Sequence, residues 1–270
     1  MARRLWRDGA AVAVVVGLMA AVSLLPPDTA LQEVQAGGVL RACVPVANAP
    51  LVIEGGPQEG IDVDILRQIA SDLGLRLSLN HNPAIGRELD PRVWRINRAT
   101  CHILGGGIVT SPVMESFMQV TDPHLESGWT VISPVPVTSL DGLTVGVLVG
   151  MVGRDRIALS RLLRAHGARI ELVETEDQLR RGLLDGRFDA GIADTILAGS
   201  IAEGQPWALS WLEDDGHDAL GFALWKGDMT LSRAVEDSLE AMRRDGRLDA
   251  IIASYGVGQP AATLPPPEGE

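Results

Sequence analysis

Short apolar runs alternate with amphipathic stretches along most of this chain. Residues 39–46 form the first run, and residues 62–73 then place apolar side chains three or four positions apart, which is typical of a helix with one buried face. Asp62 stands where a helix N-cap is favoured, and Gly74 stands just past the expected end. The elements predicted next are a strand, a short helix and a strand, at 75–79, at 91–98 and from 101 onward. This order predicts a parallel α/β unit.

The same alternation begins again at residue 139. The predicted strands and helices that follow are at 144–149, 154–165, 170–173, 175–185 and 188–193. Thr175 and Gln178 form a capping box for the second of these helices, and Asp194 follows the last strand. An extended segment over 130–137 joins this unit to the first one. Two α/β units joined in this way predict two lobes with a crevice between them.

The last third of the chain predicts a strand followed by a long helix. The strand covers 221–225, Ser232 can cap the helix, and Gly246 can end it. The segments at 185–190 and 245–250 read DGRFDA and DGRLDA. Because they are nearly identical, we expect both to connect a helix to a strand.

The segment 101–132 is the part of the chain that the rest is arranged around. It places Gly105, Gly106 and Gly107 at the end of a buried strand, followed by a turn at Thr110-Ser111-Pro112. Glycine lets other groups approach the backbone closely because it has no side chain. In open α/β sheets, ligands bind beyond the carboxyl ends of the strands. We therefore expect this segment to form one wall of a small-molecule cleft.

The first 36 residues have the pattern of an export signal. Arginines at positions 3, 4 and 7 precede an apolar run over 10–25, and two prolines follow it. The nearest segment that resembles a cleavage site, 34–36, lies far from the run, and the run approaches the length that spans a bilayer. A signal peptide and an uncleaved N-terminal membrane anchor therefore both remain open. Both place the body of the protein outside the cytoplasm, and a lipoprotein anchor is excluded because no cysteine directly follows the run.

Composition and charge exclude some classes of function. The net charge is −12, which argues against a nucleic-acid partner because phosphate binding needs a basic face. Cys43 and Cys101 fit an exported protein with one disulfide, provided that their two strands are neighbours. The five histidines lack metal-ligand spacing, so we expect no metal and no cofactor. His102 and His124 are the two expected to flank the cleft wall.

Four segments, taken in order, resemble the family 3 extracellular solute-binding proteins, the receptors of polar amino-acid ABC transporters. The resemblance covers about 38–256. Its parts are a helix start at Gly60-Ile61-Asp62-Val63-Asp64, a turn and strand at 110–112 and 120–123, a second-lobe strand from Phe188 to Asp194, and a closing pair of helices at 225–228, 245–246 and 255–256.

The resemblance implies a two-lobed α/β fold of the type II periplasmic-binding-protein kind. Each lobe would hold a mixed, mostly parallel sheet, and two hinge segments would cross between the lobes. The implied divisions are a leader or anchor at 1–36, lobe one at 37–132 plus 221–258, lobe two at 133–220, and a disordered tail at 259–270 that is rich in proline and acid.

The resemblance also implies which residues line the ligand site. In relatives that bind amino acids, an arginine in the turn holds the carboxylate and an aspartate in lobe two holds the ammonium. The aspartate is Asp194 here, but the arginine position holds Met114. The other positions implied are the wall and turn residues Gly107, Thr110 and Ser111, the first-lobe residues Asn48, Leu51 and Leu89, and the second-lobe residues Leu148, Gly150 and Met151.

The departure at Met114 changes the expected ligand. Losing a bidentate arginine would cost about 3–5 kcal/mol of carboxylate binding. A cationic or amphipathic ligand anchored by Asp194 therefore fits better than a free α-amino acid, although Asp194 is also placed to cap a helix or to pair with a local arginine. The function expected is a monomeric periplasmic receptor that serves an ABC permease in the inner membrane.

Two alternatives to this receptor stay open. One is an accessory protein of a periplasmic quinoprotein dehydrogenase, whose relatives resemble this chain in their cysteines. The other is an enzyme similar to cyclohexadienyl dehydratases, which would need an acid or base in the cleft.

Overall fold

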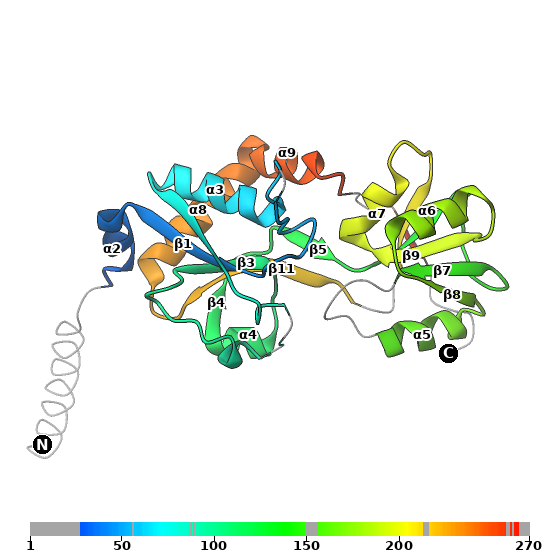
Figure 1. Cartoon of the computed structure of the whole chain (residues 1–270), viewed down its shortest axis with the longest axis horizontal. Coiled ribbons are helices and arrows are strands. Elements are labelled where there is room, and N and C mark those ends of the chain that lie inside the picture. The colour runs from blue at the N-terminus through cyan, green and yellow to red at the C-terminus, as the bar shows by residue number, and fades with distance from the viewer. Residues whose placement is uncertain are drawn as a thin grey trace, which may run out of the picture.

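The computed structural model of this protein describes residues 28–55, 57–86, 88, 90–148, 156–212, 216–257, 260 and 262–264. Two β-sheets lie side by side along the long axis of the molecule, each with its own helices (Figure 1). This is the two-lobed α/β architecture that the sequence predicted.

The sheet of the first lobe has the order β2-β1-β3-β11-β4, with β5 also paired to β11. Its strands are β1 (Val39–Val44), β2 (Arg76–His81), β3 (Ile103–Val109), β4 (Met118–Val120), β5 (Leu125–Ser127) and β11 (Asp218–Trp225). β1 runs parallel to β2 and β3, whereas β11 runs antiparallel to β3, β4 and β5. The sheet is therefore mixed, but antiparallel pairings dominate it, because β11 returns from the second lobe into its middle.

Most of the first-lobe helices cover one face of this sheet. The helices are α2 (Ala30–Gly37), α3 (Ile61–Asp72), η1 (Pro91–Val93), α4 (Pro112–Phe117), α8 (Met229–Asp245) and α9 (Arg247–Ser254). Figure 1 shows α3, α8 and α9 above the sheet and α4 below it. α3 buries Ile65, Leu66 and Ile69 against the strands, as its apolar spacing predicted. The helix predicted at 91–98 is shortened to the single turn η1 after Asp90.

The second lobe holds the sheet β12-β10-β6-β9-β7-β8. Its strands are β6 (Trp129–Ser133), β7 (Thr144–Leu148), β8 (Arg169–Val173), β9 (Ala190–Asp194), β10 (Ala208–Leu212) and β12 (Ala262–Leu264), and its helices are α5 (Arg156–Ala165), α6 (Glu176–Leu184) and α7 (Thr195–Ala202). β7 runs parallel to β8 and β9, and β6 lies antiparallel between β9 and β10. This sheet is mixed and mostly parallel, as expected.

The chain crosses between the lobes at positions a few residues away from those predicted. β6, expected to end lobe one, lies in the second sheet, and β11 already begins in the first sheet at Asp218. The first crossing is therefore at Gly128, and the second lies between Leu212 and Asp218. The borders expected at 132/133 and 220/221 were wrong, because all of β6 is buried and an apolar pattern does not say which sheet a strand joins.

The tail expected to be disordered contributes a strand. β12 pairs parallel with β10, with Ser210 opposite Ala262 and Leu212 opposite Leu264. Leu264 is buried in the second-lobe core. Proline and acid content favoured disorder, but a short apolar segment here completes the edge of a sheet.

The expected leader and the described fold overlap. Helix α2 packs in the first lobe and buries Val34, so residues 30–36 belong to the folded body rather than to a leader. Residues 1–27 lie outside the described residues, and the choice between signal peptide and anchor stays a prediction. Within the described part of the chain, no helix is long and apolar enough to cross a membrane.

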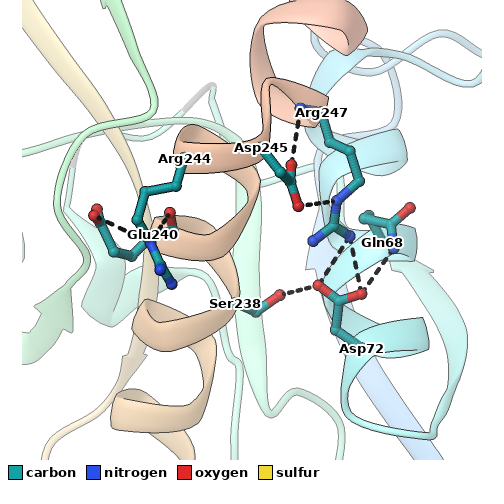
Figure 2. A network of polar contacts seen from close by, with 7 residues as sticks. All are labelled: Gln68, Asp72, Ser238, Glu240, Arg244, Asp245 and Arg247. Carbon is teal, nitrogen blue, oxygen red and sulfur yellow. Dashed lines mark hydrogen bonds and ion pairs between the residues drawn. The ribbon is translucent and has the colours of Figure 1, made fainter.

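The last two helices of the first lobe are fixed to α3 by a network around Asp72 (Figure 2). The Asp72 carboxylate accepts hydrogen bonds from Ser238 Oγ at 2.8 Å, from Gln68 Nε2 at 2.8 Å and from Arg247 Nη1 at 3.0 Å. Arg247 Nε also donates to Asp245 Oδ2 at 2.8 Å. DGRLDA therefore connects α8 to another helix, α9, and the expected helix-to-strand connection was wrong there.

Two of the expected helix caps were also wrong. Ser232 lies buried within α8, whose N-cap position is Asp228. Gly60, rather than Asp62, is at the N-cap of α3. The Thr175 cap is confirmed, because Thr175 Oγ1 accepts from Gln178 N at 3.2 Å.

Candidate ligand-binding site

A cavity of about 360 Å³ lies at the carboxyl end of β3, where the first lobe meets the start of α7 in the second. The wall of the first lobe includes Gly107, Ser111 and Met114, and the second lobe contributes Asp194 and Ile196. This is the strand end at which the sequence predicted a cleft.

The glycines of the wall are required by the close approach of side chains from the loop after β1. Gly106 and Gly107 have φ angles of 90° and 92°, which side chains rarely adopt. A Cβ at Gly106 would lie 2.3 Å from Pro45 Cδ, and one at Gly107 would lie 2.8 Å from Asn48 Nδ2. The expected close approach is therefore real, and it is made by the loop after β1.

A buried aspartate holds this wall in place. Asp62 Oδ2 accepts hydrogen bonds from Gly106 N at 2.6 Å and from Gly107 N at 3.0 Å, and Oδ1 lies 2.8 Å from His124 Nε2. The side chains of Asp62 and His124 are fully buried. The two amides therefore turn away from β11, and the β3–β11 register shifts between Gly221 and Ala223.

Asn48 and Leu51 lie on the cavity from the loop after β1. Asn48 Nδ2 donates to Gly106 O at 3.0 Å and Gly107 N donates to Asp62 Oδ2, so the peptide between the two glycines is held on one side by Asn48 and on the other by Asp62. Leu51 is almost fully buried beneath this contact.

The turn after β3 forms the start of helix α4. Ser111 is its N-cap and accepts from Met114 N at 3.2 Å. Met114 is buried in a cluster with Ile108 and Trp94, and part of it faces the cavity. The position that the resemblance assigns to an arginine therefore belongs to an apolar surface. Thr110 lies beside this turn but is not part of the cavity lining, and no described residue bonds its buried Oγ1.

Asp194 lies both on the cavity and at the N-cap of α7. Its Oδ1 accepts from Ile196 N at 2.9 Å, so the alternative of a helix cap is confirmed. Ser127 Oγ lies 2.9 Å from Oδ1 and 2.7 Å from Oδ2. With 2% of its surface exposed, this carboxylate is held in one orientation at the boundary between the lobes.

The cavity lining is acidic in the part of the chain that the structure describes. Glu88 and Asp218 lie on it together with Asp194, and no described lining residue is an arginine, lysine or histidine. Clustered carboxylates create a negative potential that attracts cations. Sequence reasoning missed Glu88, Asp218, Trp94 and Ile196, because each comes from a segment whose position depends on the tertiary fold.

The remaining expected positions divide into two groups. Leu148 ends β7 in the second-lobe core and is not part of the cavity lining. Leu89, Gly150 and Met151 lie outside the described residues.

Neither of the two histidines expected at the cleft faces the cavity. His102 precedes β3 at the opposite end of that strand, and His124 is buried behind the glycine wall, where it stacks on Phe222 at 4.4 Å. The expectation was wrong for His102, because the residue before β3 lies at the end of the sheet away from the ligand. His124 does flank the glycine wall, but from behind, through its contact with Asp62.

The expected disulfide is present. Cys43 and Cys101 are bonded, with their Cα atoms 5.5 Å apart, and the strands β1 and β3 are neighbours in the sheet. Both sulfurs lie in the cluster that also contains Met114 and Trp94. The disulfide therefore supports the back of the cavity wall.

Comparison with known proteins agrees with this architecture. A probable histidine-binding protein of Neisseria gonorrhoeae is 26% identical over 84% of this chain and 87% of its own length. The open, unliganded L-cystine receptor of the same organism has a TM-score of 0.68 at 15% identity and covers 85% of this chain and 99% of its own. An ancestral cyclohexadienyl dehydratase has a TM-score of 0.59 at 20% identity, over 83% and 95% of the two chains.

The family comparison covers both lobes. The model of the bacterial extracellular solute-binding proteins, family 3, matches residues 40–258, which run from β1 to the end of the first-lobe helices. This chain therefore belongs to the bacterial extracellular solute-binding proteins of family 3.

Proposed function

We propose that this protein captures a small cationic or amphipathic, amino-acid-like solute outside the cytoplasm and delivers it to an ABC permease. Members of its family bind small solutes and usually work with such a permease. The observation that carries the choice of ligand is the lining of the cavity, which has carboxylates from both lobes and the apolar side chain of Met114.

Asp194 is the anchor proposed for the cationic group. Ser127 and the amide of Ile196 fix its carboxylate, so a ligand would meet an acceptor that is already oriented. Hydrogen bonds to charged groups contribute about 1.5–3 kcal/mol each, which is enough to decide between a cationic and a neutral solute. Asp218 and Glu88 would add longer-range attraction.

Met114 disfavours a ligand whose binding depends on a carboxylate group, because it stands where an arginine would hold that group. Its buried thioether offers dispersion contacts and no donor, and Ile108 and Trp94 continue the same apolar surface. The solute proposed therefore has an apolar body against Met114 and a cationic head at Asp194. The name of the histidine-binding relative supports an amino-acid-like solute with a nitrogen-containing side chain.

Ligand capture would use closure of the two lobes about their crossings. Ser127 and Asp194 face each other across the boundary beside the crossing at Gly128. A ligand held between the Met114 surface and Asp194 would stabilise the closed arrangement, because only that arrangement offers both contacts.

Isothermal titration of the purified protein tests this proposal. We expect arginine, histidine and a simple diamine to bind more tightly than glutamine or leucine, and Asp194→Asn to weaken the cationic ligands about tenfold or more. Asparagine is also a good N-cap, so this variant removes the charge and retains the cap. Thr175→Ala, which weakens the cap of α6 in the same lobe, is the matched control. Equal affinity of Asp194→Asn for the cations would overturn the proposal.

The alternative role, as an accessory protein of a periplasmic dehydrogenase, stays open because its relatives resemble this chain in the two cysteines that form the disulfide. Neighbouring genes would distinguish the two roles. Permease and ATPase genes beside the coding sequence would support the importer, whereas dehydrogenase and cytochrome genes would support the accessory role.

We favour a receptor over an enzyme because neither His102 nor His124 faces the cavity. The carboxylates are then the acids and bases among the described lining residues.

A further inference from the structure

A second cavity of about 500 Å³ lies in the first lobe at the end of the sheet away from the ligand cavity. It is lined by residues of α2, by the beginning of β1 and by His102 before β3. Since β1 and β3 are parallel and β3 has seven residues, the two cavities are separated by roughly 20 Å along the strands. In Figure 1, α2 marks this outer end of the lobe.

Arg41 on β1 is a charged side chain with one buried donor that is not satisfied among the described residues of this cavity. Its Nε is buried and has no acceptor among the described residues. Arg98, on the same cavity, forms an ion pair with Asp228 at 3.1 Å, but no ion pair joins Arg41 to any carboxylate in the described ranges. A buried donor without an acceptor costs free energy, so an acceptor supplied from outside would stabilise this arrangement.

His102 adds a second donor at the same place. In the tautomer in which His102 Nδ1 accepts from Arg41 N, at 3.2 Å, the proton of the neutral imidazole is on Nε2. His102 Nε2 lies 2.5 Å from Arg41 Nη2, which is also a donor. Burial, together with the Arg41 charge, lowers the pKa of His102 to about 4, and the ring is therefore neutral near pH 7. In this tautomer, Arg41 Nη2 and His102 Nε2 are two donors that face each other without an acceptor.

We propose that this cavity binds a small, singly charged carboxylate whose oxygens accept hydrogen bonds from Arg41 and from His102 Nε2. A carboxylate matches the planar guanidinium and separates the two facing donors. The cavity is also lined by the carboxylates of Asp28, Glu33 and Asp228. Asp228 has a raised pKa because of its burial, and the charges of Asp28 and Glu33 raise it further. These acids disfavour multiply charged anions, which makes sulfate a poor ligand.

Titration of the wild-type protein with sodium acetate tests the proposal, followed by NMR of histidine side chains labelled with ¹⁵N. We expect a saturable shift of the His102 ring, identified with His102→Gln, and no comparable shift with chloride at equal ionic strength. Arg41→Met should weaken acetate binding about tenfold or more. Arg76→Met is the matched control, because Arg76 is an exposed arginine on the neighbouring strand β2.

The wild-type titration decides the matter even if Arg41→Met does not fold. Absence of a saturable His102 shift with acetate would overturn the proposal, and so would tighter binding of sulfate than of acetate or unchanged acetate binding by a folded Arg41→Met. The result is independent of the proposed importer function, because neither Arg41 nor His102 lines the ligand cavity.

Discussion

The Ser127 hydroxyl of the first lobe lies 2.9 Å and 2.7 Å from the two carboxylate oxygens of Asp194 in the second lobe. Both side chains are buried beside the crossing at Gly128. The proposed ligand anchor is therefore oriented by a residue of the opposite lobe, and its geometry depends on how the lobes meet.

Replacing Ser127 by alanine should weaken both folding and ligand binding. A buried hydrogen bond to a charged group contributes about 1.5–3 kcal/mol, and an Asp194 without its serine would be less well oriented. Urea unfolding and calorimetric titration with arginine measure the two effects. Ser116→Ala is the control, because Ser116 is exposed on α4 and its hydroxyl donates to Val113 O of the same helix at 2.7 Å. Unchanged arginine affinity in Ser127→Ala would contradict the positioning role.

Asp62→Ala should be among the most destabilising single substitutions in the first lobe. It leaves the amides of Gly106 and Gly107 and the ring of His124 buried with one acceptor fewer. Each such group costs about 1–3 kcal/mol, so a loss of about 3 kcal/mol or more is expected in urea unfolding. Asp237→Ala, on the exposed face of α8, should change stability by less than about 0.5 kcal/mol. Similar losses for both variants would show that Asp62 does not hold the wall.

Gly106→Ala should reduce stability for two separable reasons. The φ angle of 90° is strained for alanine, and the new Cβ would lie 2.3 Å from Pro45 Cδ. Gly74→Ala serves as the comparison, since Gly74 has a φ angle of 71° and open space around its Cβ position. We expect the Gly74 variant to lose about 1 kcal/mol and the Gly106 variant clearly more, as judged by thermal unfolding. Equal losses would mean that the wall yields to the extra methyl group.

Acid should weaken the contact between α3 and the last two helices. Burial raises the pKa of Asp72, but hydrogen bonds from Ser238, Gln68 and Arg247 outweigh burial, so its pKa lies below the usual 3.8. Because the pKa of Asp72 is lower in the folded than in the unfolded state, its ionised carboxylate stabilises the fold at pH values above 3.8. This stabilisation is lost as the pH falls through the folded-state pKa. Asp72→Asn should therefore flatten the fall in stability below about pH 4, measured as unfolding midpoint against pH. The exposed variant Asp237→Asn should follow the wild type, and a parallel curve for Asp72→Asn would exclude this contribution.

Removal of the disulfide should destabilise the first lobe. Cys43 and Cys101 are separated by 58 residues, and a loop of that length gives a stabilisation of about 2–5 kcal/mol. Cys43→Ala/Cys101→Ala should therefore unfold at lower urea concentration, and a reducing agent should shift the wild type toward it. A wild-type midpoint that is insensitive to complete reduction would contradict this estimate.

Local sequence patterns predicted most helices and strands. They failed where the position of a side chain or the pairing of a strand depends on segments that are distant in the sequence. The apolar spacing of 61–72 and the cap at Thr175 depend on neighbours within one or two turns, and both were predicted correctly. Asp62 had the position of a cap residue, but the amides of β3, more than forty residues away, use its carboxylate instead. The destination of β6 and the pairing of β12 likewise depend on which sheet edge is available.

The residues that line the cavity also fall into two groups, those that the sequence indicated and those that only the fold reveals. Asn48, Met114 and Asp194 lie on the cavity where the resemblance to the family placed them. Glu88 and Asp218 stand in segments without a motif, and only the folded arrangement brings their carboxylates to the same cavity.

The strand β12 ties the two lobes together a third time. Tyr255, whose hydroxyl donates to Asp64 Oδ2 at 2.5 Å, holds the chain to the first lobe, and Ala262 already pairs in the second sheet. Six residues lie between them, so the chain from Tyr255 to Ala262 spans at most about 25 Å when fully extended. An outward movement of the lobes that needs a longer reach would have to separate β12 from β10 or Tyr255 from Asp64, so the segment after α9 would limit the distance between the lobes.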